Sequence, residues 1–190
     1  MTALIERPTI EDVAAKKYAV ADTQALAPIG DSYELINGEW IEMPGQSGIH
    51  SRIITKLARY IDTYASVGKL GQTFSQGPVA LTINNEPRPD VSFVAAGKLP
   101  DYFGGPIPVV PDLVIEVNSP SDTTEGIHDK LIMYREAGVP LIWSVFMLDK
   151  YVLVHRLNDL DIQLFNLNDE LDGEDVIPGF KLKVSTIFEQ

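Results

Sequence analysis

The chain has 190 residues, a length typical of one domain with its own core, and we predict a single domain over residues 1–190. Hydrophobic residues make up 45% of the chain and charged residues 22%, as in ordinary globular proteins. The net charge of −12 argues against a protein that coats nucleic acid through bulk electrostatics. An enzyme acting on nucleic acid would need a local basic groove on this acidic body.

The sequence also excludes several kinds of site and location. It contains no cysteine, which rules out disulfides, thiolate metal ligands and a cysteine nucleophile. It has no apolar run of transmembrane length, and its N-terminus lacks the apolar segment of a signal peptide. These features predict a cytoplasmic protein without a membrane partner.

The first predicted elements are a helix over residues 9–18 and a β-hairpin over residues 33–43. The dipeptide Asn37-Gly38 lies between two β-rich runs, which is the strongest short-range signal for a hairpin. We expect the carboxylates of Glu39 and Glu42, on the second strand, to be solvated.

A helix is predicted next, over residues 49–65. Apolar residues at helical spacing predict its buried face, namely Ile49, Ile53, Leu57, Ile61 and Tyr64. Arg52 and Lys56 begin a short basic stripe on another side, and His50 lies in the first turn. Such a stripe is usually only a solvated face. Here it is the best candidate for contact with phosphate, and we predict that His50, Arg52 and Lys56 bind substrate.

Two strands are predicted over residues 73–76 and 79–83, and Asp90 opens a further apolar strand. Residues 113–117 form a short apolar run with one carboxylate, Glu116. A carboxylate in a buried strand is costly unless it is paired, hydrogen-bonded or bound to a metal. Glu116 therefore either meets a basic partner or solvent at the strand end, or is a metal ligand at the carboxyl end of a central strand.

The rest of the chain alternates helix and strand before an acidic end. A capping box of Asp122 and Glu125 predicts a helix that stops at Gly138. Further strands are predicted over three segments: residues 141–148, 151–156 and 162–165. From residue 151 onward three basic residues face eight acidic ones, so this segment should face away from a polyanion.

Asp90, Glu116 and Lys130 together suit metal-assisted hydrolysis of a phosphodiester bond. Carboxylates hold hard cations through oxygen, and such a cation polarises the phosphate and acidifies a water molecule. A lysine can position that water, help to deprotonate it or balance charge in the transition state. We predict Mg²⁺ or Mn²⁺ as the cofactor, with Asp90, Glu116 and Val117 as metal ligands.

Motifs along nearly the whole chain resemble a known family. They are Tyr33-Glu34-Leu35-Ile36-Asn37-Gly38-Glu39, His50, Pro89-Asp90-Val91, the run from Pro111 to Ser121, Lys130-Leu131 with Tyr134, Ala137-Gly138-Val139-Pro140 and Pro178-Gly179-Phe180. The chain resembles a bacterial family of the PD-(D/E)XK nuclease superfamily, grouped with restriction endonucleases and classified as a domain of unknown function. The resemblance implies an α/β, restriction-endonuclease-like fold: a mixed central β-sheet flanked by helices, with an N-terminal β-hairpin extension. It also implies a metal-dependent DNA endonuclease in which Glu34 is a further catalytic carboxylate.

The chain departs from the superfamily pattern at two places. The usual lysine two residues after the acidic residue is Asn118 here, and the resemblance implies that Lys130 on the next helix replaces it. Residues 122–125 include two acids where related chains carry several basic residues, which weakens the case for tight DNA contact.

Three functions remain open from the sequence. The first is the DNA endonuclease, which could act on two strands most simply as a C₂ homodimer. The second is a catalytically inactive binding or assembly module with the same fold. The third is a hydrolase of a small phosphorylated substrate, which suits the negative charge better but lacks a glycine-rich phosphate loop.

Overall fold

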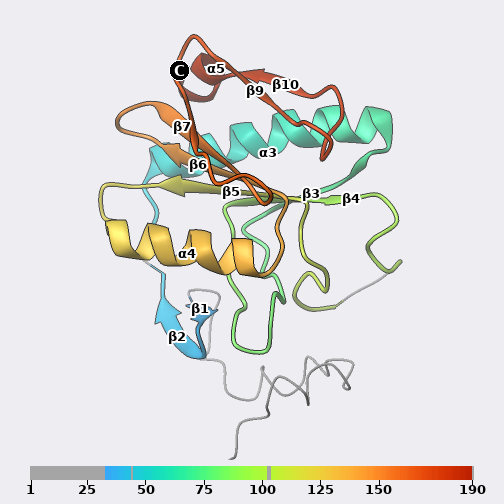
Figure 1. Cartoon of the computed structure of the whole chain (residues 1–190), viewed down its shortest axis with the longest axis vertical. Helices are drawn as coiled ribbons and strands as arrows, with labels where there is room; N and C mark the ends of the chain where they lie inside the picture. The colour runs from blue at the N-terminus through green and yellow to red at the C-terminus, as the bar shows by residue number, and fades with distance from the viewer. Residues whose placement is uncertain (1–32, 44, 102–103, 190) are drawn as a thin grey trace, which may run out of the picture.

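The computed structural model describes residues 33–43, 45–101 and 104–189, so the helix predicted over residues 9–18 lies outside the described residues. A six-stranded sheet forms the centre of the fold (Figure 1). Its strands, in spatial order, are β3 (Gly71–Ser75), β4 (Val91–Ala95), β5 (Leu113–Asn118), β6 (Leu141–Phe146), β7 (Tyr151–Arg156) and β8 (Gln163–Phe165). Only the pair of β5 and β6 is parallel, so the sheet is mixed, as the family resemblance implies.

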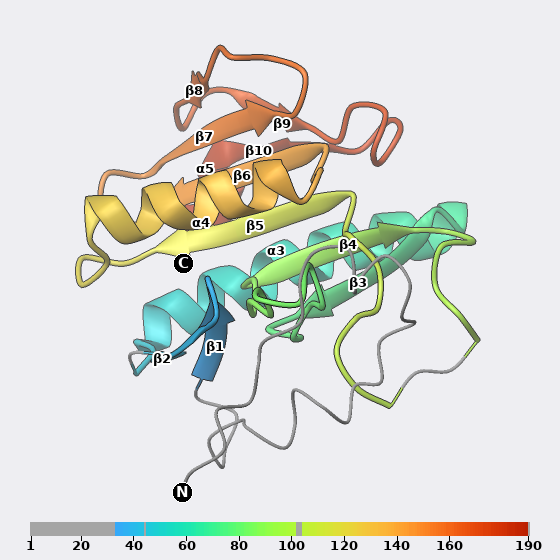
Figure 2. The ribbon, with the colours of Figure 1, turned by 60° about the horizontal axis from the view of Figure 1, so that its bottom comes forward.

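Two helices cover opposite faces of this sheet (Figure 2). The longer one, α3 (Gly48–Gly68), packs with β4 to β7 in the larger hydrophobic core. The shorter one, α4 (Thr124–Glu136), connects β5 to β6 and packs through Met133 and Tyr134 on the other face. The parallel pair requires such a crossover, because a tight turn cannot join parallel strands.

The alternation of side chains along β5 decides where Glu116 points. Ile115 and Val117 belong to the core under α3, whereas Val114 belongs to the core under α4. Because successive side chains of a strand point to opposite faces, Glu116 lies on the α4 side of the sheet. This strand therefore carries its one carboxylate toward the helix that follows it.

The N-terminal hairpin consists of β1 (Tyr33–Ile36) and β2 (Glu39–Glu42), which pair only with each other as a strand pair. Asn37 and Gly38 both have positive φ, 51° and 81°, as a two-residue hairpin turn of this kind requires. The hairpin prediction is confirmed, and Glu39 and Glu42 are exposed as expected. Glu34 is buried, because the hairpin lies beside α4 (Figure 1).

The C-terminal segment forms a small layer that packs against α3 (Figure 1). It consists of β9 (Glu170–Asp172) paired with β10 (Lys181–Lys183), followed by the short helix α5 (Val184–Phe188). Leu171, Leu182 and Ile187 bury their side chains in the core under α3. No helix in the described part of the chain is both long and apolar enough to cross a membrane.

Two predicted elements differ from the structure. The buried face of α3 is wrong at both ends, since Ile49 is 55% and Tyr64 39% exposed. His50 takes the inner position of the first turn, where its ring faces β5, and this turns Ile49 outward. The strand predicted over residues 79–83 is wrong, because this segment forms only isolated bridges, including Val79 with Ile107.

The start of α4 also differs in detail from the predicted capping box. Thr123 is the N-cap, and its hydroxyl accepts a hydrogen bond from the backbone N–H of Gly126 at 3.1 Å. The Asp122 carboxylate instead accepts from the backbone N–H of Ser119 at 2.6 Å. This contact tightens the turn between β5 and α4, which lines one wall of the candidate site.

Candidate active site

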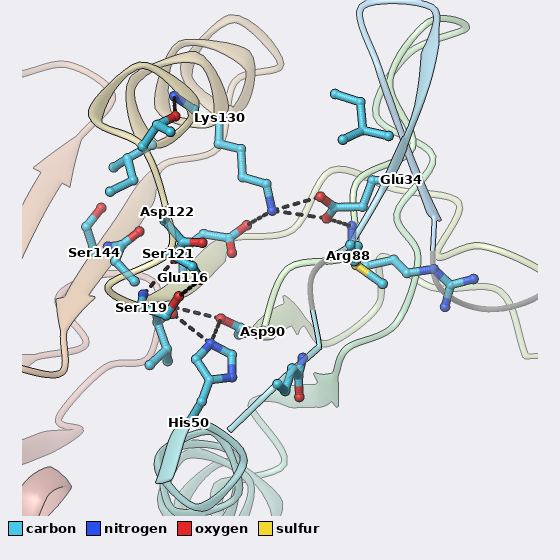
Figure 3. Close-up of a pocket in the computed structure, with 18 of the residues that line it drawn as sticks. Glu34, His50, Arg88, Asp90, Glu116, Ser119, Ser121, Asp122, Lys130 and Ser144 are labelled. Carbon is cyan, nitrogen blue, oxygen red and sulfur yellow. Dashed lines mark hydrogen bonds and ion pairs between the residues drawn. The ribbon is translucent and has the colours of Figure 1, made fainter. Parts of the chain in front are cut away.

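One cavity of about 590 Å³ gathers most of the predicted site residues (Figure 3). The N-terminal hairpin, the first turn of α3, the end of β5 and the first half of α4 form its walls. Six predicted residues line it: Glu34, His50, Asp90, Glu116, Val117 and Lys130. These residues come from segments far apart in the sequence. The pairing of β4 with β5 and the contacts of the hairpin and both helices bring them together.

Lys130 lies between two carboxylates at the centre of this cavity (Figure 3). Its ammonium nitrogen Nζ is 2.9 Å from Oε2 of Glu34 and 3.4 Å from Oε1 of Glu116. The side chain is 29% exposed, while those of Glu34 and Glu116 are 6% and 13% exposed. Glu34 also accepts a hydrogen bond from the backbone N–H of Arg88 at 2.7 Å, which fixes its position beneath the lysine.

Glu116 has a second partner on α4. The hydroxyl of Tyr134 donates to Oε1 of Glu116 at 2.6 Å. Lys130 and Tyr134 are four residues apart, so they are neighbours on one face of the helix and reach the same carboxylate oxygen. Both contacts use Oε1, and Oε2 has no hydrogen-bond partner within the described segments.

Asp90 is held from the other side of the cavity by β5. The β4–β5 ladder ends with Val91 opposite Ile115, and continuing this register would place Asp90 opposite Glu116. The Asp90 carboxylate accepts a hydrogen bond from the backbone N–H of Val117 at 2.8 Å, again through one oxygen only, Oδ2. Oδ1 has no hydrogen-bond partner in the part of the chain that the structure describes.

His50 completes this side of the cavity from the first turn of α3 (Figure 3). Its ring nitrogen Nε2 lies 2.7 Å from the carbonyl oxygen of Val117 and 3.4 Å from Oδ2 of Asp90. The hydrogen bond that the His50 ring donates to the nearby Asp90 carboxylate raises the pKa of His50, and burial opposes this change. The imidazole therefore lies against the strand and the aspartate.

Burial and neighbouring charges shift the pKa values of Glu116, Lys130 and Tyr134. Desolvation raises the pKa of Glu116 to about 7, opposed by the charge of Lys130 and reinforced by Asp90 and Glu34. Desolvation lowers the pKa of Lys130, but the charges of Glu116 and Glu34 outweigh it and raise the pKa above its usual value. Burial raises the pKa of Tyr134 as well, so its hydroxyl stays a hydrogen-bond donor to Glu116.

The donor set of the cavity fits a hard divalent cation. No group of three histidine or acidic side chains in the described ranges is arranged to hold a metal by itself. However, Asp90 and Glu116 each keep one carboxylate oxygen free of hydrogen bonds from described residues, and the carbonyl of Val117 lies beside them. Oxygen ligands of this kind are those that Mg²⁺ and Mn²⁺ prefer.

The structure does not bring Arg52 and Lys56 to this cavity. The guanidinium of Arg52 donates to the backbone carbonyl of Glu189 at 2.7 Å. The ammonium of Lys56 donates to the carbonyls of Thr186 and Glu189 at 2.9 and 2.6 Å. Both side chains thus bind backbone carbonyls of the C-terminal segment, and they are not a free basic stripe next to the acidic groups.

Sequence reasoning missed the role of Tyr134, which it named only as part of a family motif with Lys130. The spacing of four residues between Lys130 and Tyr134 was the available signal, but it does not say which strand residue the two side chains reach. Asn118 is a second residue whose setting emerges from the structure. It lines the cavity, is 8% exposed, and its amide nitrogen is buried without a hydrogen-bond partner among the described residues.

Comparison with known proteins places this chain in a family. Residues 20–185 match Uma2, a family described as "Putative restriction endonuclease". The chain belongs to the Uma2 family. The comparison with curated proteins gave no match. This membership confirms the family resemblance that the motifs indicate. The matched range includes the motifs from Tyr33 to Phe180.

A solved structure shows that the Uma2 chain shares its fold with another protein. This is the crystal structure of a "putative nuclease belonging to DUF820" from Anabaena variabilis ATCC 29413. The two chains are 20% identical, with a TM-score of 0.77, over 88% of this chain and 96% of the other. The predicted fold class, a mixed sheet between helices with an N-terminal hairpin, is therefore confirmed.

The raised pKa of Glu116 gives the first testable prediction for this Uma2 chain. Between pH 4.5 and about 7 the carboxyl group of Glu116 holds a proton in the folded protein but has released it in the unfolded chain. The free energy of unfolding therefore falls as pH rises through this range. In metal-free buffer, ionisation of Glu116 should lower the unfolding free energy of the parent protein by roughly 2–3 kcal/mol when the pH is raised from 5 to 8. Denaturant titrations should show that Glu116→Gln lacks this loss.

The comparison between parent and variant removes the other titrating groups. His155, for example, has its pKa lowered to about 4 by burial and contributes with the opposite sign. Glu39→Gln, which changes an exposed carboxylate of the hairpin, should keep the parental pH dependence. Equal pH dependence in the parent and in Glu116→Gln would show that Glu116 ionises normally in the folded protein.

Proposed function

We propose that this Uma2 protein is a metal-dependent nuclease that hydrolyses phosphodiester bonds in DNA. The observation that carries the proposal is the position of Lys130 between Glu34 and Glu116, in the same cavity as Asp90. The nuclease class is supported by the description of the family and by that of the Anabaena protein with the same fold. We infer that the cofactor is Mg²⁺ or Mn²⁺ and that the partner is DNA.

Asp90, Glu116 and the carbonyl of Val117 would hold the cation through oxygen. When bound, the ion offsets charge on the phosphate and lowers the pKa of a bound water molecule. Glu116 is presented with a fixed orientation, because Tyr134 binds one of its oxygens and leaves the other free for this purpose. Asp90 is presented in the same way by the backbone N–H of Val117.

Lys130 supplies positive charge, and it does not supply a base. Because neighbouring carboxylates raise its pKa, the amine keeps its proton at neutral pH. A protonated lysine that is already close to the reacting phosphate stabilises the negative charge that develops there. Glu34 holds this ammonium group in place from the opposite side and is thus a positioning residue in the proposal.

Cleavage assays on the parent protein test the proposal directly. Supercoiled plasmid, linear duplex and single-stranded oligonucleotide should be incubated with Mg²⁺ or Mn²⁺ and, as a control, with a chelator. We expect cleavage of at least one substrate with metal and none with the chelator. Intact DNA in every reaction with either metal would contradict the proposal.

The size of the cavity and the acidity of the chain favour one second candidate, a hydrolase of a small phosphorylated substrate. A cavity of about 590 Å³ suits a ligand of nucleotide size, and the net charge is −12. Salt separates the two functions, because DNA binding weakens steeply with ionic strength whereas binding of a small substrate depends on it far less. A steep salt dependence of the Michaelis constant would favour DNA.

A further inference from the structure

We infer that His50 is a positioning residue that holds the carbonyl of Val117 and the carboxylate of Asp90 in the arrangement that binds the cation. This inference rests on the proposed metal-dependent function and goes beyond it, because it assigns a distinct role to a side chain that was expected to contact substrate. It starts from the polar contacts of the ring, which among the described residues are with Val117 on β5 and with Asp90.

The first step concerns the proton on the ring. A backbone carbonyl can only accept a hydrogen bond, so the 2.7 Å contact with Val117 requires that Nε2 of His50 carries a proton. The same nitrogen lies 3.4 Å from Oδ2 of Asp90, so its N–H is directed at both prospective ligands. The tautomer of the neutral ring is therefore fixed by its partners.

The second step concerns Val117, whose two backbone polar groups are both held. Its N–H donates to Asp90 at 2.8 Å, and its carbonyl accepts from His50 at 2.7 Å. Together with the contact between His50 and Asp90, these contacts link α3, β5 and the residue before β4 to one another (Figure 3). A histidine that binds metal ligands in this way orients them without touching the metal itself.

The third step separates positioning from proton transfer. The other ring nitrogen, Nδ1, is shielded from solvent and has no hydrogen-bond partner among the residues that the structure describes. Nε2 is already engaged, so neither nitrogen is open to a water molecule that attacks a phosphate. The ring is itself anchored, because the backbone N–H of His50 donates to the N-cap hydroxyl of Ser47 at 3.2 Å.

Direct measurement of Mn²⁺ binding to the chain tests this role without an activity assay. His50→Gln places an amide N–H near the position of Nε2 and should keep most of the parental Mn²⁺ affinity. His50→Asn is too short to reach the carbonyl of Val117, and His50→Leu has no donor. Both should bind Mn²⁺ about tenfold or more weakly, as is typical when a residue that orients metal ligands is lost.

Two controls make the comparison specific. His128→Leu makes the same change at an exposed histidine on α4 and should bind Mn²⁺ like the parent. Thermal unfolding in chelator identifies any variant that no longer folds. If His50→Leu does not fold, the comparison of Mn²⁺ affinity between His50→Gln and His50→Asn decides the test, because both replacements are polar. Equal Mn²⁺ affinity in parent, Gln and Asn variants would overturn the inference, as would equal losses in Gln and Asn.

The outcomes also separate this inference from the proposed function. A parent that binds no Mn²⁺ would overturn both. A parent that binds Mn²⁺ and cleaves DNA, with all His50 variants binding equally well, would overturn only the role of His50. A parent that binds Mn²⁺ but cleaves nothing, with the predicted loss in His50→Asn, would support the role of His50 and contradict the nuclease.

Discussion

Replacing Asp90 with asparagine should reduce metal-dependent DNA cleavage by at least about 10³-fold while the protein stays folded. The amide oxygen of asparagine can still accept the hydrogen bond that Val117 donates to Asp90, so the contact with β5 survives. The negative charge that would hold the cation is lost. Cleavage rates at saturating Mn²⁺, together with Mn²⁺ binding, measure the effect.

Asp112 provides a matched control for this experiment. It is 8% exposed where Asp90 is 7% exposed, and each lies directly before a strand of the same sheet. Each carboxylate also accepts a backbone N–H at 2.8 Å, from Ala95 in the case of Asp112. Asp112 lies outside the cavity, so Asp112→Asn should affect stability more than cleavage. Parental cleavage by Asp90→Asn would remove Asp90 from the proposed site.

Local sequence patterns predicted the turns, strands and helix ends that are determined by residues adjacent in the sequence. The turn at Asn37-Gly38 specifies its hairpin because both residues tolerate positive φ. The buried run that contains Glu116 is a central strand, as its apolar composition indicates. The end of α4 before Gly138 was also predictable, because this position has a φ of 86°, which favours glycine.

Contacts between distant segments decided what the sequence could not predict. Arg52 and Lys56 form a basic stripe on a helical wheel, but the carbonyls that bind them belong to residues at least 130 positions later. The inward position of His50 depends on Val117, which lies on a strand 67 residues away. Helical periodicity alone would place Ile49 there, because it weighs apolar character and ignores such polar partners.

In the candidate site, too, the sequence predicted residues that line the cavity but not how they contact one another. The motifs singled out Asp90, Glu116 and Lys130, and the structure places all three in one cavity. The motifs did not show that Glu34 approaches Lys130 more closely than Glu116 does, at 2.9 Å against 3.4 Å. This matters for the chemistry, because a lysine shared between two buried carboxylates keeps its proton.

Lys130→Met should lower the cleavage rate by a factor of about 10² or more and leave Mn²⁺ affinity nearly unchanged. The ammonium group is not among the proposed ligands, so its loss removes charge near the phosphate and leaves the oxygen donors in place. Lys98→Met is the control, because Lys98 also pairs with a buried aspartate, Asp112, at 2.5 Å but lies outside the cavity. Single-turnover rates at saturating metal measure the effect.

Stability must be separated from catalysis in this variant. Removing one partner of a buried ion pair leaves an uncompensated charge and typically costs about 3–5 kcal/mol. The double variant Glu34→Gln with Lys130→Met removes both charges of the closer pair, and it should recover much of that stability. It should not recover the rate, because the charge facing the phosphate is still missing. A double variant or a Lys130→Met variant that cleaves at the parental rate would show that Lys130 has no part in the reaction.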